Sequence, residues 1–408
     1  MAPNRIFAGL DIGTTKVCCT VGESLSDREI RLLGWGSSPC AGLERGSLVN
    51  LESTAEAIAT AVDTAARMAG VTVRDAYVGI SGEHLRGVNS RGVIGISRRD
   101  KEIVREDIER VLEAARAVKI PADREVLHVI PRGFTLDGQS GIRDPVGMSG
   151  VRLEAEVHIV TFSSVPVRNL LRAVDRAGLD VEALVLQPLA ASLAVLEEDE
   201  RALGVALLDI GGGTTDLICF ENGVVQHTAI IGVGGRHLTQ DIAIGLRTPK
   251  ERAEELKVSF GSAISSLVPG EEVVEVPGVG GRGPRQISRQ VLAAILEPRA
   301  EEILTLAFQE LERCGVTDLL AAGIVVTGGS ALLPGMTGLA ERVLGLPTRI
   351  GRPGAIEGLS EEDAIPQHAA GIGILRYAAE CERARQGAGK GILGFLRRPI
   401  REWVRDYL

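Results

Sequence analysis

Two segments far apart in the chain share one sequence pattern. The first is IFAGLDIGTTKVCC, residues 6–19, and the second is GVALLDIGGGTTDLICF, residues 204–220. Each runs from an apolar stretch through Asp-Ile-Gly and a Thr-Thr pair into a second apolar stretch, a pattern typical of a β-hairpin. The repeated hairpin predicts two related halves, and a chain of 408 residues is long enough for two or more domains.

The turn of each hairpin has the chemistry of an anion site. Backbone N–H groups at a Gly-Thr turn form a concave nest that suits phosphates. Asp11 and Asp209 end the first strand of each hairpin and offer the oxygen ligands that Mg2+ prefers. One such hairpin is common without any ligand, but two that face each other would hold a polyphosphate from both sides, with both carboxylates directed at one metal ion.

Two further segments are candidates for contact with a base or sugar. AAGIVVTGGSALLPGM, residues 321–336, predicts a strand, a tight turn and a helix start, where Gly328 and Gly329 would let the backbone approach a flat ligand. In PKERAEELKVSFG, residues 249–261, Glu254 and Lys257 share one helix face and could reach ribose hydroxyls and base. Taken alone, that spacing is better explained as a solvated ion pair.

Two glycine-rich stretches do not fit nucleotide motifs. Residues 278–283 match GxGxxG, but Pro284 follows and no βαβ unit surrounds them, which favours a loop. The run GAGKG, residues 387–391, lacks both the first Gly and the final Ser or Thr of a P-loop. It predicts a flexible linker.

Composition and charge exclude several classes. The net charge of -9 disfavours general nucleic-acid binding. The six cysteines show no CxxC pair and no zinc-ligand spacing with His, so they indicate neither disulfides nor a structural metal, and they suggest a reducing, cytosolic compartment. We find no signal-peptide pattern and no apolar run of about 20 residues that would span a membrane.

The last segment, GILGFLRRPIREWVRDYL, residues 391–408, gathers large aromatic rings in a chain that is only 3% aromatic. As a helix it would have one apolar and one basic face, which is typical of a helix lying in a membrane interface. Docking on the protein's own core is the alternative, and Pro399 would begin or kink the helix. The candidate membrane residues are Ile392, Phe395, Leu396, Ile400, Trp403, Val404 and Tyr407 on the apolar face and Arg397, Arg398, Arg401 and Arg405 on the basic face.

A single anchor of this kind should bind weakly. Burial of five or six apolar side chains would contribute roughly 8 to 15 kcal/mol, and ordering the segment costs a comparable amount. Many anchors presented by one filament would bind far more firmly through avidity.

Five segments taken in order resemble the nucleotide-binding segments of the actin, Hsp70 and sugar-kinase superfamily. They are the two hairpins, VLQPLAASLAVL (residues 185–196), GIVVTGGSALLPGM (323–336) and QHAAGIGILRYA (367–378). Within that superfamily the chain is similar to the FtsA family of bacterial cell-division proteins from about Phe7 to its end. VLHVIPRGFTLDG (126–138) and GIRDPVGMSGVRLEAEVHIVT (141–161) carry this likeness most specifically, because kinases and Hsp70 lack that insert.

The resemblance implies an α/β, two-lobed actin/Hsp70-like ATPase fold with an FtsA-type inserted subdomain and a C-terminal amphipathic helix. ATP and Mg2+ would lie between the lobes. Within the insert, hydrophobic periodicity predicts a helix over residues 101–118 and strands at 126–130 and 151–161. The expected subdomains are 1–83 with 165–200 (first-lobe core), 84–164 (insert), 201–240 with 314–380 (second-lobe core), 241–313 (small second-lobe subdomain), 381–390 (linker) and 391–408 (helix).

The resemblance also implies site residues. Gln187 stands where the superfamily orients the attacking water, and because an amide cannot accept the proton we expect slow hydrolysis. Asp11 and Asp209 would hold Mg2+ through water. The expected nucleotide contacts are Asp11, Gly13, Thr14, Thr15 and Lys16 on one side of the phosphates, Asp209, Gly211, Gly212, Gly213, Thr214 and Thr215 on the other, and Glu254, Lys257, Gly328, Gly329 and Ser330 at the adenosine.

The function implied is that of a filament-forming protein on the cytoplasmic face of the membrane at the division site. It would tether FtsZ filaments there, bind further copies of itself and help recruit later divisome proteins, in part through the insert. Arg285, Arg289 and Arg299 would receive the acidic C-terminal peptide of FtsZ, although a solvated surface explains them as simply. An FtsA-like adaptor of pilus or secretion assembly and a superfamily phosphotransferase are the alternatives.

Overall fold

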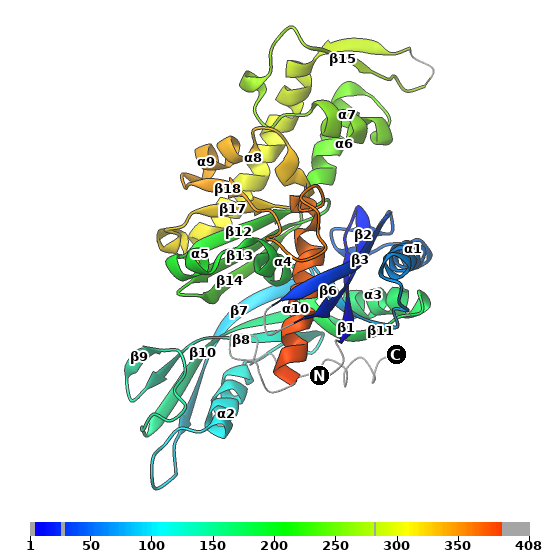
Figure 1. Cartoon of the computed structure of the whole chain (residues 1–408). Coiled ribbons are helices and arrows are strands. Elements are labelled where there is room, and N and C mark those ends of the chain that lie inside the picture. Colours follow the sequence, from blue (N-terminus) through cyan, green and yellow to red (C-terminus); the bar gives the residue numbers. More distant parts are fainter. Residues whose placement is uncertain (1–4, 26–28, 281–282, 386–408) are drawn as a thin grey trace.

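Two lobes stand one above the other, each built on a five-stranded mixed sheet (Figure 1). The computed structural model describes residues 5–25, 29–280 and 283–385. In each sheet three antiparallel strands are followed by two parallel ones, so the repeat seen in the hairpins extends to the topology of both sheets. The first has the order β11-β6-β1-β2-β3 and the second β14-β13-β12-β17-β18.

The strands of both sheets are short and mostly buried, as expected for sheets covered on both faces. The first-lobe strands are β1 (Ile6–Ile12), β2 (Lys16–Ser24), β3 (Ile30–Pro39), β6 (Asp75–Ile80) and β11 (Asp180–Leu186). The second-lobe strands are β12 (Val205–Ile210), β13 (Thr215–Glu221), β14 (Val224–Ile231), β17 (Ile324–Thr327) and β18 (Thr348–Ile350). A two-stranded ribbon of β4 (Leu43–Glu44) and β5 (Ser47–Leu48) joins β3 to the first helix.

Helices cover both faces of the first-lobe sheet. Helix α1 (Leu51–Ala69) and helix α3 (Ser164–Arg176) pack on one side, and α4 (Gln187–Val195) and α10 (Ala369–Arg385) pack together on the other. Asn50 caps α1 by accepting a hydrogen bond from the Ser53 amide at 3.0 Å. The helix lies close over β3 because a Cβ at Gly36 would be only 2.2 Å from the Ala61 carbonyl oxygen.

The second lobe carries a small subdomain at the top of the molecule (Figure 1). It consists of helices that pack around α8 and a hairpin of β15 and β16. The elements are α6 (Gly235–Leu246), α7 (Lys250–Phe260), β15 (Val273–Val276), β16 (Arg285–Ser288) and α8 (Arg289–Arg313). Below it, α4 contacts β12 and β13, while α8 contacts β13 and β14 and α9 (Met336–Leu344) contacts β18. Shorter pieces are α5 (Glu198–Leu203) and the 3-10 turns Ser265–Leu267, Thr317–Leu319, Gly329–Leu332 and Pro366–His368.

The insert between β6 and α3 is a small antiparallel sheet with one helix. Its strand order is β7-β10-β8-β9, and α2 packs on β7 and β10. The elements are β7 (Leu85–Gly95), α2 (Arg105–Arg116), β8 (Arg124–Leu136), β9 (Gln139–Ile142) and β10 (Arg152–Ser163).

Two expectations for the insert need correction. The helix begins at Arg105 rather than at residue 101, because Asp107 accepts a hydrogen bond from the Val104 amide at 3.2 Å and so fixes the first turn there. Strands β7 and β9 were missed because they lie at the two edges of the sheet and their sequences, LRGVNSRGVIG and QSGI, are largely exposed and poor in apolar residues. The two expected strands are present and longer than predicted.

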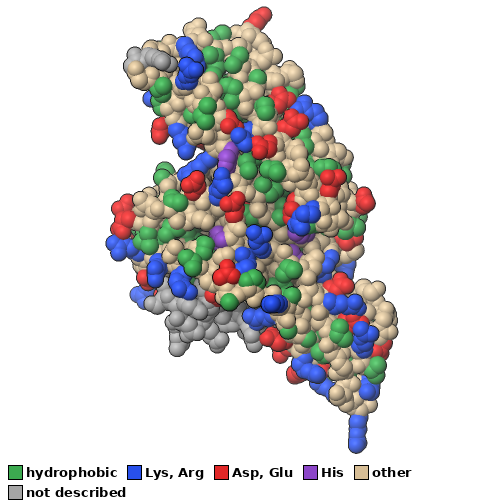
Figure 2. All heavy atoms as spheres, turned by 180° about the vertical axis from the view of Figure 1, so that it is seen from behind, with side chains coloured by type: hydrophobic (Ala, Val, Ile, Leu, Met, Phe, Trp, Pro, Cys, Tyr) green, Lys and Arg blue, Asp and Glu red, His purple; other side chains and the backbone are tan. Residues whose placement is uncertain are grey.

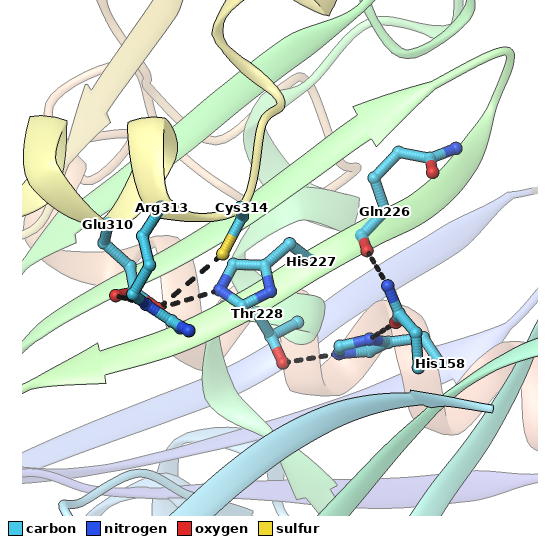
Figure 3. Close-up of polar contacts among 8 residues, drawn as sticks. His158, Gln226, His227, Thr228, Glu310, Arg313 and Cys314 are labelled. Carbon is cyan, nitrogen blue, oxygen red and sulfur yellow. Dashed lines mark hydrogen bonds and ion pairs between the residues drawn. The ribbon is translucent and has the colours of Figure 1, made fainter.

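Polar side chains join the insert to the edge strand of the second-lobe sheet (Figure 3). His158 of β10 shares hydrogen bonds with Thr228 of β14 at 2.8 Å and with Asn89 of β7 at 2.6 Å. Asn89 donates to the Gln226 carbonyl at 3.4 Å, and Arg132 of β8 donates to the Gln226 side chain at 3.1 Å. Burial lowers the pKa of His158 to about 3, so this ring is neutral. The insert is thus continuous in sequence with the first lobe and hydrogen-bonded to the second.

Candidate functional site

The turns of the two repeated hairpins meet between the lobes. Each turn is closed by the same backbone hydrogen bond, from Gly13 to the Lys16 carbonyl and from Gly211 to the Thr214 carbonyl, both at 2.9 Å. A Cβ at Gly212 would lie 2.4 Å from Thr15 Cγ2. Only glycine lets the turns approach this closely, and the expectation that the hairpins face each other matches the geometry.

A cavity of about 290 Å3 lies beside these turns. It opens where Figure 2 shows a notch in the edge of the molecule, between the small subdomain and the first lobe. Almost every residue expected at the nucleotide lines it: Asp11, Gly13, Thr14, Thr15, Lys16, Gln187, Asp209, Gly211, Gly212, Gly213, Thr214, Glu254, Lys257, Gly328, Gly329 and Ser330.

Thr215 is the expected residue that does not line the cavity. It is fully buried, and its hydroxyl donates a hydrogen bond to the Val233 carbonyl at 2.8 Å. Thr215 begins β13, and successive side chains of a strand point to opposite faces. The hydroxyl is therefore used to tie β13 to the segment before α6.

Three carboxyl groups line the cavity close together: Asp11 and Asp216 are buried, and Asp209 is partly exposed. Burial raises the pKa of Asp11 to about 6 and that of Asp216 to about 7, while Lys16 opposes the rise at Asp11. The pKa of Asp209 is raised well above its ordinary value by burial and then by the charges of Asp216 and Asp11. Desolvation and like charges disfavour ionisation, so these carboxyls favour a nearby cation.

The ammonium of Lys16 is buried in the same place. Among the described residues its Nζ atom has no hydrogen-bond partner. A buried cation without a partner is costly unless a ligand completes its hydrogen bonds. Its position beside a Gly-Thr turn fits an anionic ligand such as phosphate.

Gln187 begins α4 and reaches the first hairpin. Its amide Nε2 donates a hydrogen bond to Asp11 Oδ1 at 2.5 Å. The amide is held on the carboxylate that lines the cavity, in a place where it could orient water but not accept a proton.

Glu254 and Lys257 form the ion pair that their spacing alone favoured, but only its Glu254 end, 47% exposed, is well solvated. The Lys257 ammonium donates to Glu254 Oε2 at 2.8 Å, to Thr239 Oγ1 at 2.9 Å and to the Gly235 carbonyl at 3.1 Å. The Lys257 side chain is only 14% exposed. The pair joins α7 to α6 and faces the cavity.

Gly328 lets the turn after β17 pass over Asp209. Its φ of +85° lies in the region that favours glycine. A Cβ here would be 2.3 Å from Asp209 Oδ1. A side chain at this position would therefore collide with the carboxylate that is expected near the metal.

Sequence reasoning missed three residues of the site. Asp216 lines the cavity and accepts a hydrogen bond from Ser81 at 2.7 Å. Arg236 lines it as well and donates across the lobes to the Leu43 carbonyl at 2.8 Å and the Cys40 carbonyl at 3.0 Å. The carboxylate directly after GGGTT was a usable signal for Asp216, whereas Ser81 and Arg236 have none in the local sequence.

The three arginines expected to bind a peptide are all bound within the chain. Arg285 donates to the Leu246 carbonyl at 2.6 Å. Arg289 pairs with Glu272 at 2.5 Å, and Arg299 pairs with Asp241 at 2.7 Å. They lie on β16 and α8 of the small subdomain.

The C-terminal helix expected over residues 391–408 lies outside the described residues, as do residues 386–390 of the expected linker. Within the described part of the chain, no helix is both long and apolar enough to cross a membrane. The interfacial helix therefore remains a hypothesis from sequence.

The duplicated sheets and the cavity between them define an actin-like fold. MreB5 of Spiroplasma citri bound to ADP is similar with a TM-score of 0.56 and 16% identity, over 94% of this chain and 98% of that chain. A chain of the PilM-PilN type IV pilus biogenesis complex gives a TM-score of 0.65 and 18% identity, over 92% and 99% of the two chains.

Sequence comparison identifies the family. Cell division protein FtsA of Pseudomonas aeruginosa is 46% identical over 92% of this chain and 90% of that protein, and FtsA of Bacillus subtilis is 41% identical over 94% and 86%. The family described as cell division protein FtsA matches residues 206–373, and the SHS2 domain inserted in FtsA matches residues 82–161. The chain belongs to the FtsA family of cell division proteins.

Replacing Asp216 by Asn should stabilise the ligand-free protein at high pH only. The pKa of Asp216 is raised from 3.8 to about 7 in the folded state, so its burial penalty is absent near pH 4 and complete above pH 7. Asn can still accept the hydrogen bond of Ser81. Thermal unfolding should show the variant about 2 to 5 °C more stable at about pH 8 and no different near pH 4. An equal difference at both pH values would contradict this.

Proposed function

We propose that this FtsA-family protein binds ATP with Mg2+ between its lobes and forms actin-like filaments on the cytoplasmic face of the membrane. There it tethers FtsZ filaments at the division site and helps recruit the divisome. The observation that carries the nucleotide site is the meeting of two hairpin turns beside buried carboxyls and the buried Lys16 ammonium. An ammonium without a hydrogen-bond partner beside crowded carboxyls suits a bound phosphate together with a cation better than either ion alone.

The residues present fit both parts of this ligand. Asp11 and Asp209 would hold Mg2+ through water, which would relieve the crowding of their charges. Lys16 and the amides of the two turns would bind phosphate oxygens. Glu254 and Lys257 would lie at the adenosine with Gly328, Gly329 and Ser330. Structures of the related MreB5 of Spiroplasma citri contain ADP and AMPPNP.

The nucleotide would act mainly as a ligand that holds the lobes together. Gln187 orients toward Asp11 but cannot accept a proton, which supports slow hydrolysis. Arg236 already bonds the second lobe to carbonyls of the first. A polyphosphate bound by both lobes would add to the hydrogen bonds of Arg236 and favour one closed form. A single closed form suits filament assembly, because filaments are built from subunits of uniform shape.

Lys16→Ala should weaken binding of ATP with Mg2+ by about 10- to 100-fold, the usual value of hydrogen bonds to a charged group. Lys119→Ala removes an exposed lysine of the insert and serves as the matched control. Calorimetric titration of both variants measures the effect. If Lys16→Ala and Lys119→Ala bind ATP equally well, the phosphate role of Lys16 is wrong.

The FtsZ peptide would bind at Arg285, Arg289 and Arg299. Its carboxylates would replace the acidic side chains with which Arg289 and Arg299 pair inside the chain. Each of Arg289 and Arg299 already pairs with an acid of its own subdomain, Glu272 and Asp241. An acidic peptide could replace Glu272, whose side chain is well exposed, at little cost in desolvation.

Removing a positive charge and removing its acidic partner should change the affinity for the peptide in opposite directions. Arg289→Glu should weaken binding of the FtsZ C-terminal peptide, and so should Arg299→Glu, whereas Glu272→Gln frees the Arg289 guanidinium and should strengthen it several-fold. Arg105→Glu, on the exposed start of α2, is the control for charge reversal. Fluorescence anisotropy with labelled peptide measures each affinity, and ATP binding should be unchanged throughout. Unaltered peptide affinity in all variants would refute this surface.

Membrane binding would depend on the apolar and basic faces of residues 391–408. Full-length protein should float with anionic liposomes, and a chain that ends at Arg385 should not. Replacing Arg397, Arg398, Arg401 and Arg405 together by Gln should lower flotation, because each Arg near anionic lipid contributes about 1 kcal/mol. Equal flotation of the full and shortened chains would end the anchor hypothesis.

A further inference from the structure

Three metal-ligating side chains converge at the edge of the second-lobe sheet, away from the nucleotide cavity (Figure 3). His227 comes from β14, while Glu310 and Cys314 lie one helical turn apart at the end of α8. Glu310 Oε1 is 3.0 Å from His227 Nε2 and 4.0 Å from Cys314 Sγ. One ligand atom from each residue lies within 4.8 Å of the others.

These separations are close to those of a tetrahedral zinc site. Zinc bonds of about 2.0 to 2.3 Å at tetrahedral angles place neighbouring ligand atoms about 3.3 to 3.7 Å apart. The observed distances of 3.0 and 4.0 Å bracket that range, so small side-chain rotations suffice. A set of imidazole nitrogen, carboxylate oxygen and thiolate sulfur favours Zn2+ over Mg2+ or Ca2+.

The surroundings hold the ligands while leaving a way in. Arg313 Nε donates to Glu310 Oε2 at 2.9 Å and so orients the carboxylate, as outer partners do in metal sites. The Arg313 side chain is 66% exposed and can keep this bond while its second contact, to Oε1, is released. The side chains of His227 and Glu310 are 11% and 20% exposed, which allows a cation to enter.

We propose that His227 Nε2, Glu310 Oε1 and Cys314 Sγ bind one Zn2+ ion, with a water molecule as the fourth ligand. Binding replaces the thiol proton of Cys314, which passes to solvent, and the thiolate then forms the Zn–S bond. The cysteine pattern in the sequence gave no sign of this site because its histidine and acidic ligands are 83 residues apart, on a strand and a helix.

The site would join α8 to β14, the strand against which the insert packs. His227 precedes Thr228, the residue whose hydroxyl bonds His158 of the insert. A metal bond from His227 to the end of α8 would fix β14 at this point. The ion would thus stiffen the contact between the insert and the second lobe.

Cobalt provides a direct probe of the thiolate ligand. The full chain, freed of metal by a chelator and titrated with Co2+, should take up one equivalent with a near-ultraviolet thiolate-to-cobalt absorption band. Cys314→Ser should lose this band, and Cys381→Ser, a matched change at a half-buried cysteine of α10, should keep it. Carboxylates of the nucleotide cavity cannot produce a thiolate band, so the band distinguishes Co2+ bound at Cys314 from Co2+ bound in that cavity.

Zinc itself should protect Cys314 from alkylation, as peptide mass spectrometry would show, and should compete Co2+ from the site. His227→Gln should weaken Zn2+ binding by about tenfold or more, because even outer-shell changes cost 10- to 100-fold. Unchanged ATP binding by each variant shows that it is folded. The absence of a thiolate band in the unaltered protein, or its persistence in Cys314→Ser, would overturn the assignment.

Discussion

The close contact of two glycine turns is the constraint on which the rest of the molecule depends. Gly212 and Gly213 lie against the side chains of Thr15 and Thr14, so the lobes meet where glycine backbone of one turn packs on threonine side chains of the other. The same contact forces the carboxyls at the ends of β1 and β12 into one buried space. Such crowding is unfavourable in the free protein, and a bound cation with an anion beside Lys16 would relieve it. Relief of this crowding would thus favour the proposed ligand binding.

The insert is continuous with the first lobe, where His128 of β8 accepts a hydrogen bond from the Leu186 amide, and it is hydrogen-bonded to the second lobe as well. Ser81, at its base, bonds Asp216 of the cavity, and His158 in its sheet bonds Thr228 of β14. A change in the separation of the lobes must therefore strain or break bonds at both points. This arrangement gives a physical route by which the state of the cavity could alter the position of the insert.

The sequence predicted those features of the fold and the site that contiguous residues form by themselves. The two hairpins, Asp11 and Asp209 were found because strand, turn and strand are contiguous in sequence, and the duplication pointed to two lobes. Thr215 was placed wrongly because one residue along a strand reverses the face to which a side chain points. Arg236, Ser81 and the cluster around His227 depend on long-range packing that no single segment encodes. Strand β7 was missed because an exposed edge strand needs few apolar residues.

We propose that one nucleotide is held by both lobes at once. Hydrogen exchange measured by mass spectrometry tests it directly, because residues 12–16 and 210–216 fall in separate peptides. ATP with Mg2+ should slow exchange in both segments together, with half-maximal protection at one ligand concentration. Protection of only one segment, or of neither, would contradict it.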